Sequence, residues 1–276
     1  MSVARRTIPS SGETIPVLGC GTWSVFDIGP EEQRRAPLRT VLSAMLDAGA
    51  TMIDSSPMYG RAEGVVGDLL AALPTPERAF VATKVWTRGR REGIRQMERS
   101  MALLRRDRID LMQIHNLVDW REHLATLRDW KREGRIRYLG VTHYTASAYD
   151  ELAAVLRSET LDFVQLNYSL DEREAEERLL PLAHDRGIAV IVNRPFGGGG
   201  LVKSLARRPL PAWAAEAGCG SWAALCLKFV LAHPAVTCAI PATGDVAHMR
   251  DNLASAAEPL PDGAFSRRIL AAYQSI

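Results

Sequence analysis

The sequence predicts an α/β protein, a (β/α)8 TIM barrel with an N-terminal β-hairpin that closes the bottom of the barrel. Short apolar runs typical of buried parallel strands alternate along the chain with stretches of helical periodicity. The length of 276 residues also suits one such barrel, which typically takes about 250 residues. We therefore expect residues 1–276 to form a single domain.

The chain begins with the pattern of a hairpin. Residues 7–9 and 14–16 both read Thr-Ile-Pro and are short extended runs, and the polar residues 10–13 form a turn between them. Because this hairpin precedes the first barrel strand, we expect it to lie across the barrel's bottom.

Eight apolar, strand-like runs follow the hairpin. They span residues 17–23, 51–54, 79–84, 109–115, 138–143, 163–167, 188–192 and 236–240. Helical spacing of apolar residues predicts helices at 38–48, 62–73, 94–104, 124–134 and 152–156, from 246, and at 265–273. Eight such strands favour a closed barrel. The alternative, an open doubly wound sheet, lacks a Gly-x-Gly-x-x-Gly fingerprint after the first strand.

Three consecutive strand-like runs end on or near an ionisable side chain. These are Asp54, Lys84 and His115, and Tyr59 follows Asp54 in a loop that contains Pro and Gly. The carboxyl ends of barrel strands converge on one face and build the active site. For any one of these residues a structural role is the commoner explanation, but four at successive strand ends favour a site.

This set of side chains suits general acid catalysis on an aldehyde or ketone. A tyrosine hydroxyl has a pKa of about 10, and a lysine ammonium beside it favours the phenolate form. A carboxylate beside the lysine keeps the ammonium charged and oriented. A histidine can then hold the carbonyl oxygen between itself and the tyrosine.

Two loops at the same end of the barrel have features of a phosphate site. Four glycines, residues 197–200, follow the seventh strand, and residues 241–245 follow the eighth and lead into a helix near Val246. Glycines let backbone amides approach a phosphate, and a helix N-terminus favours an anion. The loops therefore predict a cradle for a diphosphate, although a plain flexible loop is the alternative for 197–200.

The charge composition argues against a nucleic-acid partner. The formal net charge is +2 and 24% of residues are charged. Basic and acidic residues are interleaved, so we expect no nucleic-acid partner. The basic residues of 88–95 are interpreted as the exposed start of a helix.

The cysteines and the N-terminus indicate the compartment. Cys20, Cys219, Cys226 and Cys238 form no Cys-x-x-Cys pair and show no zinc-like spacing with histidine, so we expect reduced thiols and no metal. No apolar signal core follows residues 5–6, and no window approaches a membrane span. We expect a cytoplasmic protein without a membrane partner.

Taken in order, these motifs resemble those of the aldo-keto reductases, and the resemblance covers essentially the whole chain. The matching positions are Ile15-Pro-x-x-Gly-x-Gly-Thr-Trp23, Asp54 with Tyr59-Gly60, Thr83-Lys84, Ile114-His115, Gly140-Val-Thr, Gln165, and Ile240-Pro followed by Asn252. The resemblance implies an NAD(P)H-dependent oxidoreductase on a (β/α)8 barrel. It also implies that Tyr59 is the proton donor, that Lys84 and Asp54 tune it, and that His115 orients the carbonyl.

The resemblance further implies a set of cofactor contacts at the strand ends. They are Gly21, Thr22, Trp23, Thr142, His143, Gln165, Asn193, Arg194, Pro195, Phe196, Gly197, Thr243, His248, Asp251 and Asn252. Within this set, Gln165 matches the position that holds the nicotinamide carboxamide. The adenosine end falls to Thr243, Asp251 and Asn252.

Several of these positions depart from the family's pattern. Thr142-His143 replaces a frequent Ser-Asn. Asn193 replaces the aromatic residue that stacks on the nicotinamide, and the flat guanidinium of Arg194 beside it is a candidate to replace that stacking. Ala242 and His248, with Arg250 nearby, replace the Lys and Arg that hold the 2′-phosphate, which needs charge-assisted partners. NADP(H) is still favoured, and NAD(H) or dual use is the alternative.

Four aromatic residues are candidates for the walls of the substrate cleft, namely Trp23, Phe26, Trp86 and Trp120. Each is also compatible with core packing, and we expect two of the four to contact a small-molecule carbonyl substrate. Little chain follows the last helix, so an open cleft with broad specificity is expected. The resemblance implies a monomer, since family members are often monomeric and no exposed apolar helix is evident in the sequence.

Two other functions compete with carbonyl reduction. A barrel that binds a nicotinamide nucleotide as a regulatory or redox-sensing module would need no proton donor, so the complete set around Tyr59 argues against it. A metal-dependent hydrolase would need several His and carboxylate ligands at strand ends, and only Asp54 and His115 are available in the first four strands.

Overall fold

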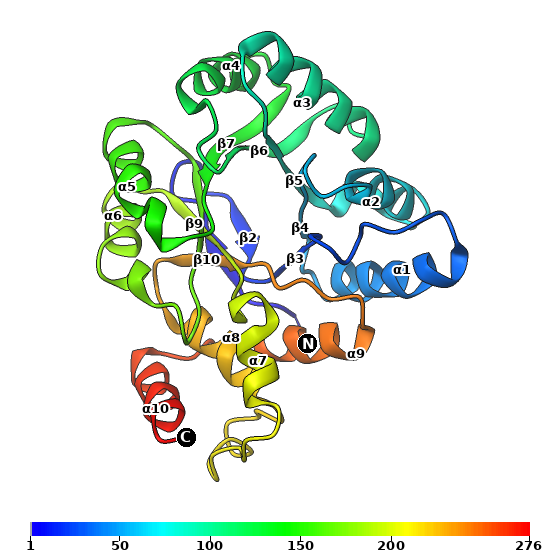
Figure 1. The fold of residues 1–276 in the computed structure, drawn as a ribbon. Helices are drawn as coiled ribbons and strands as arrows, with labels where there is room; N and C mark the ends of the chain where they lie inside the picture. Colours follow the sequence, from blue (N-terminus) through cyan, green and yellow to red (C-terminus); the bar gives the residue numbers. More distant parts are fainter. Residues whose placement is uncertain (1) are drawn as a thin grey trace.

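The computed structural model describes residues 2–276 and confirms the (β/α)8 barrel (Figure 1). The barrel strands are β3 (Gly19–Gly21), β4 (Met52–Asp54), β5 (Phe80–Val85), β6 (Ile109–His115), β7 (Ile136–Thr142), β8 (Phe163–Asn167), β9 (Ala189–Asn193) and β10 (Val236–Ala239). Neighbouring strands pair in parallel and in chain order from β3 to β10. Every predicted strand is present, with ends that differ by a few residues.

The barrel closes at a short seam between β3 and β10. A single isolated bridge joins Leu18 and Ala239 in parallel. Two backbone hydrogen bonds accompany it: the Ala239 amide donates to the Val17 carbonyl at 2.8 Å, and the Gly21 amide donates to the Pro241 carbonyl at 3.3 Å. The seam is therefore the most weakly paired part of the wall.

The predicted hairpin is confirmed at the bottom of the barrel. β1 (Arg5–Thr7) pairs antiparallel with β2 (Thr14–Pro16). Ile8 and Ile15 are buried in one apolar cluster with residues from the starts of the barrel strands, including Phe80 and Phe163. The hairpin thus fills the amino-terminal end of the barrel and leaves the other end for a site.

Helices surround the strands on the outside, as Figure 1 shows. They are α1 (Glu32–Asp47), α2 (Ala62–Ala71), α3 (Arg90–Leu104), α4 (Trp120–Arg132), α5 (Tyr149–Ser158), α6 (Leu179–Asp185), α7 (Gly200–Leu205), α8 (Trp222–Ala232), α9 (Val246–Ser255) and α10 (Gly263–Gln274). The shorter 3-10 turns are η1 (Pro76–Arg78), η2 (Ala146–Ala148), η3 (Glu174–Glu176) and η4 (Gly197–Gly199).

Most helix ends follow the sequence signals. Gly49, two residues after α1, has a φ of 83°, a conformation that glycine adopts without strain. Helix α8 is the main element without a sequence prediction. Nearly all of its residues are buried, so no polar face marks its helical period.

The barrel interior changes character along its axis. Its lower end is the apolar cluster under the hairpin. At the strand carboxyl ends the buried side chains are polar or charged: Asp54, Lys84, Gln113, His115 and Gln165. A buried polar group needs partners, so this end is where chemistry is expected.

Other sequence expectations can be compared with the structure directly. Cys20, Cys219, Cys226 and Cys238 are buried and free. Within residues 2–276, no three His, Cys, Asp or Glu side chains are grouped so as to hold a metal ion. The same residues contain no helix of the length and apolarity needed to cross a membrane.

Candidate active site

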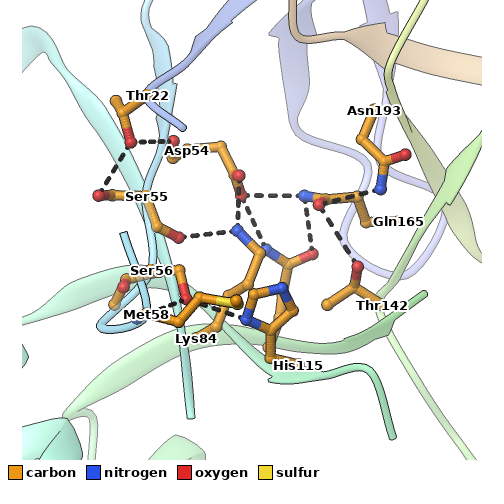
Figure 2. A network of polar contacts seen from close by, with 12 residues as sticks. Thr22, Asp54, Ser55, Ser56, Met58, Lys84, His115, Thr142, Gln165 and Asn193 are labelled. Atoms are coloured by element: carbon orange, nitrogen blue, oxygen red, sulfur yellow. Dashed lines mark hydrogen bonds and ion pairs between the residues drawn. The ribbon is translucent and has the colours of Figure 1, made fainter. Parts of the chain in front are cut away.

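The structure brings the four predicted catalytic residues together at the carboxyl ends of β4 to β6. Figure 2 shows three of them, Asp54, Lys84 and His115. Lys84 Nζ donates to Asp54 Oδ2 at 2.6 Å and to the Ser55 carbonyl at 2.7 Å. The same ammonium lies 5.1 Å from the centre of the Tyr59 ring. Tyr59 and His115 meet edge to face, with 5.8 Å between ring centres.

The Lys84–Asp54 ion pair is buried, with side chains 0% and 2% exposed. Burial by itself lowers the pKa of Lys84, but the charges and hydrogen bonds of Asp54 and Tyr59 together outweigh burial and the pKa is raised. The lysine is therefore a fixed positive charge directly beneath Tyr59.

The pKa of Tyr59 corrects one expectation. Burial raises this pKa above its usual value, and the charge of Lys84 acts in the opposite direction without cancelling burial. Lys84 thus limits the rise instead of producing the net lowering that the sequence suggested. At neutral pH Tyr59 keeps its proton, as a proton donor must.

His115 is a neutral imidazole. Burial, followed by the charges of Lys84 and His143, lowers its pKa to about 2. Its Nδ1 lies 2.9 Å from the hydroxyl oxygen of Ser56, a residue with no exposed surface. Ser56 was not anticipated as a site residue.

Two glutamines hold the other oxygen of the Asp54 carboxylate. Gln113 Nε2 donates to Asp54 Oδ1 at 3.0 Å. Gln165 Nε2 donates to the same atom at 2.9 Å (Figure 2). Gln113 was also missed in the sequence. It lies two positions before His115 in a strand, so the two share a face, and a lone amide inside an apolar run was the available signal.

Gln165 was expected to hold the nicotinamide carboxamide, but both ends of its side chain already form hydrogen bonds within the protein. One end is bound to Asp54, and its Oε1 accepts from Thr142 Oγ1 and Asn193 Nδ2, both at 3.4 Å. Asn193 Nδ2 also donates to the His143 carbonyl at 3.4 Å. The ends of β7, β8 and β9 are therefore joined by one network.

The remaining predicted cofactor residues lie at the ends of β3, β7, β9 and β10. Gly21 ends β3, and Thr22 Oγ1 donates to the Asp54 carbonyl at 3.0 Å. His143 stacks on the exposed Tyr144, with 5.7 Å between ring centres. Arg194 Nη2 lies 3.6 Å from Glu172 Oε1, and the Arg194 guanidinium lies 5.9 Å from the Tyr144 ring centre.

The glycine loop is a tight turn in the structure. Gly197, Gly198 and Gly199 have φ angles of 56°, 66° and 89°. The amides of Gly197 and Gly199 donate to the carbonyls of Arg194 and Phe196 at 2.9 and 2.8 Å. Those two amides are therefore already bonded within the turn, and Pro195, between Arg194 and Phe196 in the sequence, is buried.

The N-terminus of α9 also differs from the expected row of free amides. Asp245 Oδ1 accepts from the Ala247 amide at 2.7 Å, so a carboxylate of the protein caps this helix. Thr243 Oγ1 accepts from the Asp245 amide at 3.1 Å. Further along α9, Asn252 is buried and His248 is exposed.

One more residue at this end contacts α8. Asp251 Oδ2 accepts from Ser221 Oγ at 2.8 Å, and Ser221 also caps α8 through the Ala224 amide. The predicted adenosine contacts Thr243, Asp251 and Asn252 thus lie on one loop and one helix.

The four aromatic candidates for the cleft divide into two pairs. Trp23 and Trp86 are 59% and 40% exposed, and the Trp86 ring centre lies 6.4 Å from that of His115. Phe26 is fully buried and Trp120 is 9% exposed, and both belong to the hydrophobic core. Trp23 and Trp86 therefore remain the two candidates for substrate contact, while the burial of Phe26 and Trp120 favours the alternative of core packing.

Comparisons with known proteins point to one family. A family model described as the aldo/keto reductase family matches residues 17–268. Methylglyoxal reductase YeaE of Escherichia coli (strain K12) is 30% identical over 258 residues, covering 91% of this chain and 89% of that protein. An NADH-specific methylglyoxal reductase of the same organism is 31% identical over 230 residues, covering 72% and 69%. A solved aldo/keto reductase from Klebsiella pneumoniae, in complex with NADP and acetate, has a TM-score of 0.79 at 26% identity, covering 95% and 93%.

Proposed function

This chain belongs to the aldo/keto reductase family, and we propose that it reduces aldehyde or ketone carbonyls to alcohols with NAD(P)H. The observation that carries the proposal is the buried Lys84–Asp54 pair, at 2.6 Å, placed beneath Tyr59 and beside His115. A binding module would gain nothing from a fixed charge beneath a proton donor.

In this proposal Tyr59 gives its proton to the carbonyl oxygen as the carbon accepts a hydride. The phenolate that remains is stabilised by the Lys84 ammonium. Asp54 and the Ser55 carbonyl hold that ammonium in place, at 2.6 and 2.7 Å. Neutral His115 binds the same carbonyl oxygen and fixes its position against Tyr59.

The residues at the ends of β7 to β9 fit a nicotinamide. When bound, this group supplies the hydride. Asn193 Oδ1 is buried and has no hydrogen-bond partner within residues 2–276. A carboxamide N–H would satisfy this acceptor. We assign the carboxamide to Asn193, with Thr142 and Gln165 as neighbours.

The substrate proposed is a small carbonyl compound. Two of the relatives are methylglyoxal reductases, and the exposed Trp23 and Trp86 offer apolar walls beside His115. An activated aldehyde with a short apolar group suits this combination.

The deciding experiment is Tyr59→Phe. Loss of the proton donor should lower kcat at least about 100-fold, the scale of general acid catalysis, while cofactor affinity followed by tryptophan fluorescence stays unchanged. Tyr273→Phe, on α10 away from the site, is the matched control and should keep parental activity. Equal kcat in Tyr59→Phe and parent would contradict the role of Tyr59.

A parent protein that binds nicotinamide nucleotides but reduces no member of a carbonyl panel would instead support a regulatory binding barrel.

Separate titrations with NADPH and NADH address the cofactor. Ala242 offers no charge to a 2′-phosphate, and Asp245 places a carboxylate at the start of α9. We propose NADP(H) as the cofactor because of the family, with comparable NADH affinity as the result that would assign dual use.

A further inference from the structure

His115 can hold a carbonyl oxygen only if it points an N–H toward it. A neutral imidazole carries one proton, on either Nδ1 or Nε2, and the partner of one nitrogen decides where the proton sits. The tautomer of His115 therefore decides whether the ring can donate a hydrogen bond to the substrate.

The partner of Nδ1 is Ser56. Its hydroxyl oxygen lies 2.9 Å from His115 Nδ1, and the same oxygen accepts the Met58 amide at 3.3 Å. Ser56 is 0% exposed and His115 is 5% exposed, so water does not compete freely for either group. Figure 2 shows the contact at the edge of the polar network.

The hydroxyl group can satisfy all these contacts in one way only. Ser56 has a single proton to donate, and Oγ already accepts from the Met58 amide. If Nδ1 also carried a proton, the buried hydroxyl proton would face no acceptor, which is unfavourable. If Nδ1 is bare, Ser56 donates to it and each group is paired.

We propose that Ser56 is a positioning residue that holds His115 with its proton on Nε2, so that Nε2–H donates to the substrate carbonyl oxygen. This inference rests on the proposed function. Nε2 forms no hydrogen bond with any of residues 2–276, so it is free for a ligand. The rings of Tyr59 and Trp86 flank His115, with centres 5.8 and 6.4 Å away.

The charges around His115 act in the same direction. The Lys84 ammonium and burial both oppose a second proton on the ring, so the site holds the neutral form. With only one proton available, its location decides whether His115 donates to the oxygen or repels it. In the Ser-His-Asp triad of serine proteases, a histidine left in the wrong tautomer loses most of its catalytic value.

The test combines kinetics with nitrogen-15 NMR of the histidine rings. Ser56→Ala removes the donor, Ser56→Thr retains a hydroxyl, and Ser255→Ala removes another buried hydroxyl, on α9. His115→Gln identifies the His115 resonances. We expect Ser56→Ala to lower kcat about tenfold, the scale of one hydrogen bond, with little change in KM. Ser56→Thr should recover most of the loss, and Ser255→Ala should keep parental kcat.

In the parent, Nδ1 should resonate as an unprotonated nitrogen and Nε2 as a protonated one, and Ser56→Ala should show a mixture. A protonated Nδ1 in the parent would overturn the proposal, and this measurement needs neither a variant nor turnover. Parental kcat and an unchanged tautomer in folded Ser56→Ala would overturn it as well. A parent that reduces no carbonyl would defeat the proposed function, while the NMR result would still decide what Ser56 does.

Discussion

Asp54 receives a hydrogen bond from Lys84 on one carboxylate oxygen and from Gln113 and Gln165 on the other. Charge-assisted hydrogen bonds are stronger than neutral ones, and three of them compensate for the removal of this carboxylate from water. The arrangement also makes Asp54 depend on its partners, because an unpaired buried charge is costly.

Lys84→Met should therefore destabilise the protein by about 3 to 5 kcal/mol, since it leaves the Asp54 carboxylate buried without its cation. The double variant Lys84→Met with Asp54→Asn removes both charges and should recover much of that loss. Urea unfolding of the two variants and the parent measures the difference. A double variant as unstable as Lys84→Met would show that the uncompensated charge is not the cause.

His115 should make stability depend on pH. Its pKa is near 6.5 in the unfolded chain and about 2 in the folded protein. Above pH 6.5 both states are neutral at this residue and it contributes no slope. Below pH 6.5 the unfolded chain takes up a proton that the folded protein refuses, so the free energy of unfolding falls as pH falls, by up to about 1.4 kcal/mol per unit.

The comparison of parent with His115→Gln between pH 7 and 5 isolates this contribution. Burial also lowers the pKa of His143 and His233, so the variant should keep part of the slope and lose roughly 1 to 2 kcal/mol of the decrease at pH 5. Identical slopes in the two proteins would mean that His115 titrates normally in the fold.

The grouping of Asp54, Lys84 and His115 could be predicted from the sequence, because strand carboxyl ends are fixed by topology and lie on one face of the barrel. Gln113 and Ser56 could not, because amides and hydroxyls occur in many structural roles and only their distances to Asp54 and His115 distinguish them. The sequence also left open whether Phe26 lines the cleft or packs in the core, because a loop sequence does not reveal the burial of an aromatic ring, and the structure buries it.

At the scale of elements, helices α2 and α3 pack closely enough to require a glycine. A Cβ on Gly67 would clash with the backbone of Leu103 and lie 3.0 Å from the Leu104 carbonyl carbon. Gly64, one turn earlier in α2, has room: its Cβ would lie 3.6 Å from Leu103 Cδ2, an ordinary contact. The two glycines thus have opposite roles in one helix.

Alanine substitutions should separate these roles. Gly64→Ala should stabilise the protein by about 0.5 to 1 kcal/mol through helix propensity. Gly67→Ala should instead destabilise it by roughly 1 to 3 kcal/mol, because overpacking against α3 exceeds the gain in propensity. Thermal unfolding of both variants tests the pair, and a stabilised Gly67→Ala would show that α2 and α3 can move apart at little cost.

Helix α8 shows why some elements escaped sequence reasoning. The stretch Trp222–Ala232 is buried along almost its whole length, between the barrel wall and helices α9 and α10. A helix without a solvated face has no polar stripe, so its periodicity is weak even though its residues favour helix. In contrast, α3 and α4 each carry an exposed charged face, and their predicted positions were confirmed.

At the scale of the whole molecule, the part of the barrel wall with the fewest backbone hydrogen bonds lies next to the proposed cofactor loops. The seam between β3 and β10 depends on the Ala239–Val17 and Gly21–Pro241 hydrogen bonds and one bridge. Strand β6, in the middle of the strand order from β3 to β10, pairs with both β5 and β7 along much of its length. Local opening should therefore begin at the seam.

Hydrogen exchange should show this order. Amides in residues 17–21 and 236–241 should exchange faster than those in 109–115, because fewer backbone hydrogen bonds hold them. The proposed cofactor residues Thr22 and Thr243 flank the seam, so opening it should release the nucleotide. NADP+ at about 100 times its Kd should then slow exchange at the seam up to about 100-fold, equivalent to about 2.7 kcal/mol, and leave β6 less affected. Equal protection of all strands without ligand, or protection by NADP+ confined to β6, would contradict a barrel that opens where its cofactor binds.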